Sequence, residues 1–245
     1  LATFRVHIAP LGFEIDRIII PLKQTKADKL WLLAHDNRSS DLSAPYLEKI
    51  KKECKKLGVE VKVAYSDRLN LFQTIKSIKD VINQEKNNYI YVNVASGSKI
   101  QAIACMMACM VLKECKNLQP FYAEPESYAA FEGKQQSFGI KDTIPLPTYE
   151  IQIPKPKLLQ ALKIVQQAKN QKITKKEMAE LAEKQEIITI NSEEKNHSQA
   201  RFASLDKNII QPLVDEWNFV EVEKIGRNRW IKITQEGKNA AEFLI

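Results

Sequence analysis

Along the first 140 residues, short apolar runs alternate with stretches in which apolar residues recur at helical spacing. This alternation is typical of βα units, in which parallel strands form the centre of a sheet and helices cover it. The pattern therefore predicts an α/β fold with a Rossmann-like, largely parallel sheet. The strands are expected at residues 3–9, 29–34, 60–65, 89–94 and 119–123, and the helices at residues 13–23, 44–56, 69–84 and 99–113.

Two local features modify this first domain. Pro21 lies inside the first helical pattern and is expected to kink it, because its ring meets the carbonyl of Arg17. At the other end, short strands at 129–132 and 136–140 are expected to form a hairpin that finishes the sheet.

A stiff connector follows at residues 142–157, which hold four of the ten prolines and show no helical period. We therefore expect a first domain at residues 1–141 and a second at residues 158–245.

The second domain has a different order of elements, with helices first and a β-ribbon near the end. Its helices are expected at 158–168, 175–184 and 198–216, and its strands at 219–224 and 229–234, with a closing helix at 235–244. Thr174 and Glu177 form a capping-box pattern before the second helix, and Pro212 should bend or divide the third. This order predicts a C-terminal winged helix-turn-helix.

The excess of positive charge lies in the first domain. The net charge is +7, and residues 1–157 hold 23 Lys and Arg against 17 Asp and Glu, whereas residues 158–245 hold 14 against 13. The basic excess is compatible with an anionic ligand of the first domain, although lysine-rich helices are usually solvated faces.

The four cysteines, Cys54, Cys105, Cys109 and Cys115, have no paired zinc spacing and are interpreted as free thiols. With three histidines in the chain, no metal site is expected. No apolar run is long enough to span a membrane, and a cytoplasmic location is expected.

The chemistry of the first domain is expected at the carboxyl ends of its strands. The stretch from Tyr89 to Lys99 leads from a strand through Gly97 into a helix. The first N–H groups of that helix would face an anion. Loops after the first and second strands should meet the same edge. The candidate ligand residues are Leu11, Gly12, Phe13, Asn37, Ser96, Gly97, Ser98 and Lys99. Glu14 and Arg17 could contact the ligand or simply pair with each other.

In the second domain, the third helix would enter the major groove of duplex DNA while the hairpin tip reaches the backbone. Gln199 and Arg201 can donate to base edges, and arginines of the wing suit phosphates. The candidate DNA-binding residues are His197, Ser198, Gln199, Arg201, Lys207, Arg227, Asn228 and Arg229. The nearly balanced charge of this domain keeps a protein-docking role open.

Taken together, the loop at Pro10–Arg17, the strand end at Asn93–Lys99 and the winged helix resemble the archaeal CARF family, CRISPR-associated Rossmann-fold domains fused to a MarR-like DNA-binding module. The family's glycine-hydroxyl-lysine motif falls on Gly97, Ser98 and Lys99, and its first loop on Leu11 to Phe13. Where many members have two glycines and a threonine, this chain has Ser96 and Ser98 around Gly97. The resemblance implies a homodimer with one shared pocket for a cyclic oligoadenylate, cyclic tetra-adenylate being preferred.

These observations favour a ligand-responsive, DNA-binding transcription regulator with no cofactor beyond its regulatory ligand. Two alternatives stay open. The first is a metal-independent ring nuclease, in which Lys99 would stabilise the phosphate attacked by a ribose 2′-hydroxyl; it ranks second because no general base is evident. The other is a CARF sensor whose winged helix docks a protein instead of DNA.

Overall fold

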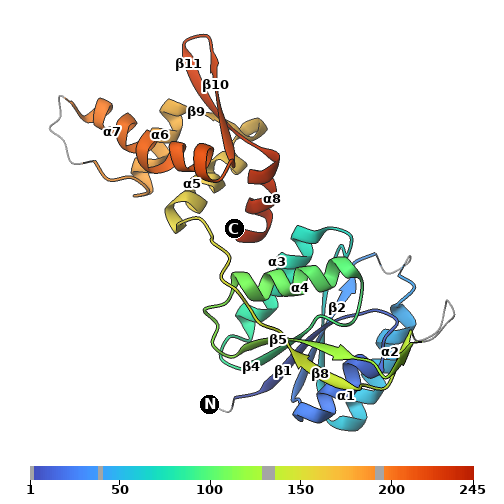
Figure 1. Ribbon diagram of the computed structural model, residues 1–245. Helices are drawn as coiled ribbons and strands as arrows, with labels where there is room; N and C mark the ends of the chain where they lie inside the picture. Colours follow the sequence, from blue (N-terminus) through green and yellow to red (C-terminus); the bar gives the residue numbers. More distant parts are fainter. Residues whose placement is uncertain (1–2, 38–40, 129–135, 191–195) are drawn as a thin grey trace. The chain divides into compact units, whose positions relative to one another are not determined.

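The computed structural model describes residues 3–37, 41–128, 136–190 and 196–245. The chain divides into two compact units, Leu1–Gln152 and Ile153–Ile245, and each is described by itself (Figure 1). The division falls inside the expected connector. Across the described residues, none of the helices has the length and apolar character needed to cross a membrane.

One sheet of six strands organises the first unit, in the order β3-β2-β1-β4-β5-β8. The first five strands run parallel and β8 runs antiparallel to β5, so the predicted, largely parallel Rossmann-like sheet is confirmed. The strand order reverses between β1 and β4, which places the ends of these two central strands next to each other. The strands are β1 (Arg5–Pro10), β2 (Lys29–His35), β3 (Glu60–Ser66), β4 (Tyr89–Asn93), β5 (Leu118–Glu124) and β8 (Asp142–Pro145).

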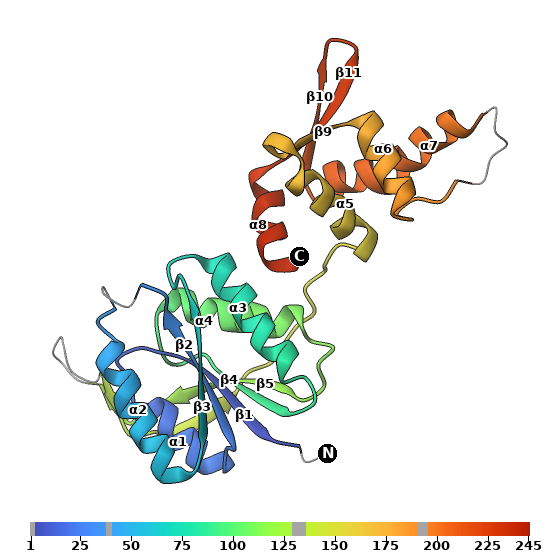
Figure 2. The same cartoon turned by 180° about the vertical axis from the view of Figure 1, so that it is seen from behind.

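Helices cover both faces of this sheet. Figures 1 and 2 show α3 and α4 on one face and α1 and α2 on the other. The first helix begins at residue 16, three residues later than the pattern predicts, because residues 11–15 form the loop that leaves β1. The helices are α1 (Asp16–Thr25), α2 (Ala44–Leu57), α3 (Leu71–Gln84) and α4 (Lys99–Val111).

The chain after β5 differs from the expectation. Asp142–Pro145 belongs to the sheet as β8 and not to the connector, because its backbone pairs with β5, from Phe121↔Pro145 to Glu124↔Asp142. Proline is tolerated there because β8 is an edge strand. The expected hairpin falls largely on residues 129–135, outside the described residues; on either side of them, β6 (Ser127–Tyr128) and β7 (Ser137–Phe138) pair antiparallel.

A hydrogen bond ties the end of β4 to α1. Pro21 lies within a continuous α1, and because proline has no N–H it cannot donate to the carbonyl of Arg17. Asn93 replaces that missing donor: its Nδ2 donates to the Arg17 carbonyl over 2.7 Å, and its Oδ1 accepts from the Ala95 N–H over 2.8 Å. The residue that ends β4 therefore fixes both the first helix and the loop that follows β4.

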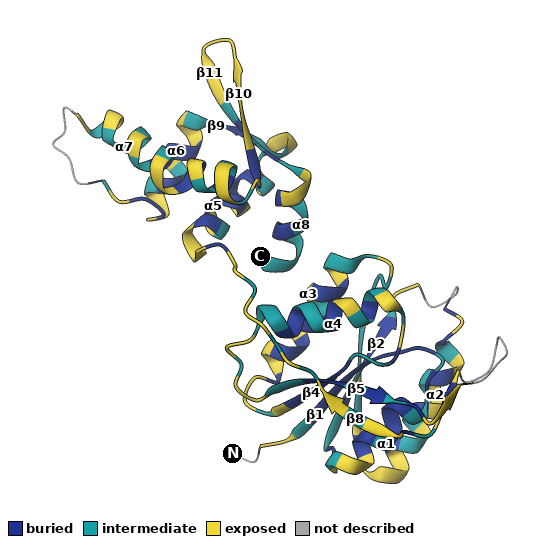
Figure 3. Ribbon diagram, in the orientation of Figure 1, coloured by how far each residue is buried: buried dark blue, intermediate teal, exposed yellow. Residues whose placement is uncertain are grey.

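The second unit has the element order of a winged helix, as predicted. Its helices and a three-stranded sheet in the order β10-β11-β9 enclose one apolar core, and Figure 3 shows the β10–β11 hairpin exposed along most of its length. The elements are α5 (Pro156–Gln167), β9 (Lys172–Thr174), α6 (Lys175–Lys184), α7 (His197–Leu205), β10 (Val220–Ile225), β11 (Asn228–Ile233) and α8 (Gln235–Leu244). The capping box of Thr174 and Glu177 at the start of α6 is present.

Three details of this unit depart from the sequence pattern. The long third helix ends as α-helix at Leu205 and continues as two wider, π-helical turns, Asp206–Ile210 and Pro212–Glu216, so that the second turn starts at the proline. β9 has only three residues and was not expected. Trp230, an aromatic residue of the strand expected at 229–234, is partly exposed and lies outside the buried cluster.

A histidine is buried at the centre of the first unit. His7 in β1 is 2% exposed, and its ring stacks on Tyr91 with 5.0 Å between centroids. Its Nε2 lies 2.8 Å from the hydroxyl of Thr25. Because burial penalises the charged imidazolium, the pKa of His7 is lowered from 6.5 to about 3.

We therefore expect acid to destabilise the first unit through His7. Between pH 6.5 and about 3 the unfolded chain binds a proton that the folded protein does not, so stability is retained above pH 6.5 and falls as the pH drops through this window. The slope attributable to one group is about 1.4 kcal/mol per pH unit. His7→Gln should flatten the pH dependence of the unfolding free energy by up to that amount.

The measurement is urea unfolding at several pH values in a background carrying Trp217→Phe and Trp230→Phe, so that Trp31 alone reports on the first unit. Carboxylates contribute equally to both proteins and cancel in the difference. Equal slopes with and without His7→Gln would contradict the prediction.

Candidate functional site

The carboxyl edge of the sheet in the first unit brings two loops together. β1 and β4 lie side by side and parallel, and helices on opposite faces follow them. In open α/β sheets the crevice at such a reversal of strand order is where ligands bind. The loops are residues 11–15 after β1 and residues 94–98 after β4.

These loops touch through their backbones. A Cβ built on Gly12 would lie 2.8 Å from both Cα and N of Gly97, closer than a real side chain allows. Gly97 has a φ of +75°, and a Cβ there would collide with Cβ of Pro10. The pair of glycines is thus required by close approach, and at Gly97 also by the left-handed backbone.

The serine side chains of the β4 loop are committed to holding this arrangement. Ser96 is buried and its Oγ donates to the Pro10 carbonyl over 2.8 Å. Ser98 caps α4: its Oγ accepts from the N–H of Gln101, and its own N–H donates to Gln101 Oε1. Gln101 Nε2 in turn donates to the Leu33 carbonyl of β2 over 3.3 Å. The two hydroxyls that the sequence suggested for a ligand therefore already have protein partners.

Within the described residues, this loop offers a ligand a cation and two main-chain donors. The N–H groups of Lys99 and Ile100 occupy the first two positions of α4, where a helix offers no internal acceptor. The side chain of Lys99 is exposed, and within the described residues it pairs with no carboxylate. Because the helix dipole adds partial positive charge at this end, the combination suits a phosphate or another anion.

The β1 loop supplies backbone and packing. Leu11 is 2% exposed within the core, so its side chain lies away from solvent. The ring of Phe13 packs edge-on against Tyr46 of α2, with 5.5 Å between centroids. Glu14 and Arg17 form a buried ion pair, with 3.5 Å between Arg17 Nη1 and Glu14 Oε1. Of the two roles that the sequence left open for these residues, the structure shows pairing with each other.

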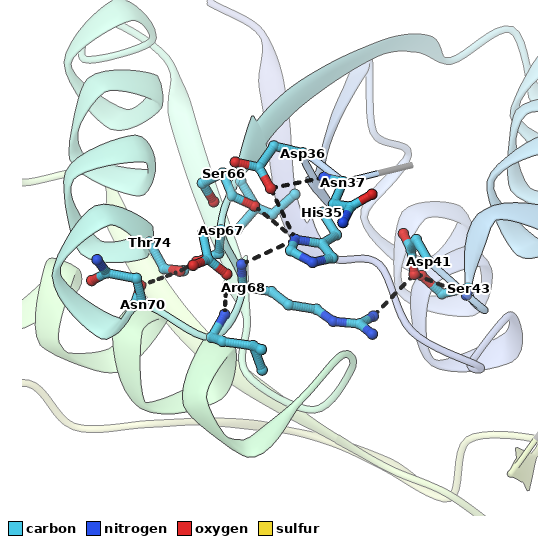
Figure 4. Close-up of polar contacts among 12 residues, drawn as sticks. His35, Asp36, Asn37, Asp41, Ser43, Ser66, Asp67, Arg68, Asn70 and Thr74 are labelled. Atoms are coloured by element: carbon cyan, nitrogen blue, oxygen red, sulfur yellow. Dashed lines mark hydrogen bonds and ion pairs between the residues drawn. The ribbon is translucent and has the colours of Figure 1, made fainter. Parts of the chain in front are cut away.

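A third group of polar residues lies at the ends of β2 and β3 (Figure 4). His35 Nδ1 lies 3.1 Å from Asp36 Oδ1 and 3.4 Å from the Ser66 carbonyl. Arg68, in the loop after β3, places its Nη1 3.0 Å from Asp41 Oδ1. Asn37 is exposed at the same edge, and residues 38–40 lie outside the described residues.

Sequence reasoning missed Arg68. Its guanidinium is partly exposed, and its Asp41 partner is itself held by both the N–H and the hydroxyl of Ser43. The available signal was an arginine three residues after the end of a predicted strand, at the edge where open α/β sheets bind ligands. Its carboxylate partner lies 27 residues away in the chain, so no local motif marks it.

In the second unit the start of α7 is tied to α6. The carboxylate of Glu183 in α6 pairs with two of the candidate DNA-binding residues. The distances are 2.9 Å to His197 Nε2 and 3.1 Å to Arg201 Nη1. Arg201 Nε is buried and has no hydrogen-bond partner within the described part of the chain. Arg201 therefore holds the two helices together. Ser198 and Gln199 are exposed on α7, and Lys207 is exposed on the π-helical turn that follows it.

The hairpin concentrates its free cations at the tip. A two-residue turn, Gly226 and Arg227, joins β10 to β11, and Gly226 supplies a φ of +63°. Arg227, Asn228 and Arg229 are exposed. Nearer the base, Lys232 pairs with Glu221 over 2.7 Å, and this hydrogen-bonded carboxylate raises the pKa of the lysine. The tip can reach an anion such as a DNA backbone.

The thiols of α4 offer no chemistry at the site. Cys105 and Cys109 are buried, and burial raises the pKa of both, that of Cys109 to about 12. They remain protonated at neutral pH and pack as small apolar side chains.

These features define a class of protein in which a Rossmann-like domain is followed by a winged helix. The edge of the sheet in the first domain is suited to an anion. Comparison with known families agrees: residues 5–128 match the HFX_2341-like N-terminal family, and the chain belongs to it. Residues 157–245 match the DUF6293 C-terminal winged helix domain. The order of domains expected from the CARF resemblance is thereby confirmed.

One curated relative is the uncharacterized protein MJ1513 of Methanocaldococcus jannaschii, 28% identical over 212 residues. The match covers 76% of this chain and 63% of the relative, so this chain spans less than two thirds of that protein.

Two solved structures are similar to this chain at low identity. Can2 from Sulfobacillus thermosulfidooxidans, in complex with cyclic tetra-adenylate, is 13% identical, with a TM-score of 0.43 and coverage of 97% of this chain and 63% of that one. Csm6 from Enterococcus italicus, bound to cyclic hexa-2′-fluoro-hexa-dAMP, is 13% identical, with a TM-score of 0.41 and coverage of 52% and 34%.

The contact between the two loops leads to a stability prediction. Gly97→Ala should destabilise the first unit by about 2–4 kcal/mol, because it adds a collision to the cost of a left-handed alanine. Gly58 is the matched control: it has a similar φ of +71°, and a Cβ there would meet nothing within 4 Å. Gly58→Ala should therefore cost only about 1–2 kcal/mol. Urea unfolding followed through Trp31 measures both, and equal losses would show that the loop contact is not tight.

Proposed function

We propose that the protein is a homodimeric transcription regulator that binds duplex DNA and responds to a cyclic oligoadenylate, with cyclic tetra-adenylate as its ligand. The observation that carries the proposal is the exposed Lys99 beside two uncommitted N–H groups at the start of α4. Charge-assisted bonds from a cation and main-chain donors at a helix N-terminus are well suited to a phosphate.

The size of the ligand supports a dimer. A ring of four nucleotides presents four phosphates, whereas one chain offers one Lys99 and one helix terminus at this loop. A two-fold axis next to the carboxyl edge would bring a second, identical set to the other side of the ring, as closed symmetric dimers do. Each chain then supplies half of the site.

The DNA half of the proposal rests on the exposed polar groups of the second unit. Gln199 on α7 has a side-chain amide that can bond both donor and acceptor of an adenine edge. Arg227 and Arg229 at the hairpin tip suit backbone phosphates. Two winged helices in a dimer would double these contacts and compensate for the balanced charge of the single domain.

Sensing and DNA binding would be linked through the connector between the units. A ligand that binds one arrangement of the dimer more tightly shifts the population toward it, and the spacing of the two α7 helices would change with it. A DNA site with two-fold symmetry reads that spacing directly.

The ligand is tested by calorimetric titration of the full chain with cyclic tetra-adenylate. We expect one ligand per two chains, and Lys99→Ala should weaken binding at least about tenfold, because two charge-assisted bonds per ligand are lost. Lys113→Ala is the matched control, since this exposed lysine follows the opposite end of the same helix. Absence of heat at micromolar concentrations would refute the assignment of this ligand.

Chromatography of the ligand recovered from the same titration separates a sensor from a nuclease. A sensor returns the ring intact, whereas a linear product would establish the ring-nuclease alternative.

DNA binding is tested with random-sequence duplexes enriched for binding to the full chain. Gln199→Ala should lower affinity for the enriched sequence about 5- to 150-fold. Arg227→Ala should weaken all sequences alike and reduce the salt dependence by about one unit per chain. Arg201→Ala should instead lower the unfolding free energy by about 1–3 kcal/mol, since it leaves the Glu183 bridge half made. Failure to enrich any duplex would favour protein docking.

A further inference from the structure

A pocket of about 820 Å³ lies within the second unit, away from α7 and from the tip of the hairpin. Its walls come from the end of α5, the turn at Lys169–Gln171, β9, α6 and β11. Apolar side chains line its inner part, among them Ile164, Leu181 and Trp230. The volume falls in the range of small-molecule sites, which are mostly apolar with a few placed polar groups.

Trp230 explains why this pocket exists. Ile231 and Ile233 of β11 are buried in the core, whereas Trp230 points to the other face of the strand, where the pocket lies. An indole there is partly exposed, although a large aromatic side chain usually gains most from full burial. A planar ring laid against it would complete that burial.

Cations dominate the rim. Lys169, Lys172 and Lys184 line the pocket, and Lys172 Nζ lies 5.2 Å from the centre of the Trp230 ring. Within the described residues, Lys169 and Lys184 pair with no carboxylate. Two acidic residues, Glu177 and Glu180, also line it.

The carboxylates of Glu177 and Glu180 differ in their hydrogen bonds. Glu177 Oε2 accepts from both the N–H and the hydroxyl of Thr174, and these bonds lower the pKa of Glu177. Its carboxylate is thus held at the α6 cap but keeps its negative charge. Three lysines against Glu177 and Glu180 leave the lining with a net charge of +1.

The turn that carries Lys169 is strained. Asn170 and Gln171 have φ values of 56° and 55°, two consecutive non-glycine residues in the left-handed region. Such residues cost about 1–3 kcal/mol each and gather at ligand clamps and other functional sites. Asn170 lines the pocket, whereas Glu186 and Asn218, the other non-glycine residues described with positive φ in this unit, do not.

We propose that this pocket is a second ligand site, which binds a small aromatic anion. The ring of the ligand lies against Trp230 and the aliphatic floor, and its carboxylate or sulfonate meets the lysines of the rim. This site uses none of the residues of the sheet edge in the first unit or of the DNA face, so it stands independently of the proposed function.

The probe is 1-anilinonaphthalene-8-sulfonate, a fluorescent aromatic anion, titrated into the full chain carrying Trp31→Phe and Trp217→Phe. Trp230 is then the sole tryptophan, and energy transfer from it reports a probe bound nearby. We expect saturable binding of one probe per chain. The double variant Lys169→Glu/Lys184→Glu should weaken it at least tenfold, whereas Lys176→Glu should change it less than twofold.

Lys176 is the matched control because it is exposed on the same helix and does not line the pocket. The three lysine substitutions are at exposed positions, which protects folding. Competition defines the ligand class: 2-naphthoate should displace the probe, and neutral 2-naphthylmethanol should be at least tenfold weaker. Equal binding by the charge-reversed variant, transfer that does not saturate, or equal displacement by the neutral competitor would overturn the proposal.

Discussion

The close approach of Gly12 and Gly97 is the constraint on which the candidate ligand site depends. Two loops that leave neighbouring strands for opposite faces of the sheet meet there with no room for a side chain. The surrounding hydrogen bonds serve that contact: Ser96 reaches back to β1, and Gln101 reaches β2 while closing the cap of α4. Because α4 is thereby held at its first turn, Lys99 and the free N–H groups have a defined place at the edge of the sheet.

The sequence predicted the features that depend on neighbouring residues and missed those that depend on distant ones. Strand and helix periods, and the capping box at Thr174, are local patterns and were found. The capping role of Ser98 was not predicted, although Ser98 and Gln101 have the spacing of a capping box. β8 was not predicted, because a proline-rich stretch has the composition of a connector. It forms a strand because its backbone pairs with β5.

Charged residues illustrate the same limit. A single sequence lists arginines near a site, but whether each is free depends on a carboxylate elsewhere in the chain. Arg201 looked available for a base edge, yet Glu183, 18 residues earlier, binds it. Arg68 was overlooked, yet Asp41 holds it at the edge where ligands bind. Pairing thus ties Arg201 to α6 and positions Arg68 at the sheet edge.

In the winged helix, α6 links the proposed pocket to the proposed DNA face. One side of α6 lines the pocket through Leu181 and Lys184, and the other holds α7 through the Glu183 bridge and through Lys175, whose Nζ lies 2.5 Å from Asp206 Oδ2. A ligand that shifted α6 would stretch these bonds while Arg201 stays buried. Weakening one such bond costs about 1–3 kcal/mol, equivalent to a change of about 5- to 150-fold in an equilibrium constant. A modest preference of the ligand for one position of α6 would therefore suffice to control the proposed contact of α7 with DNA.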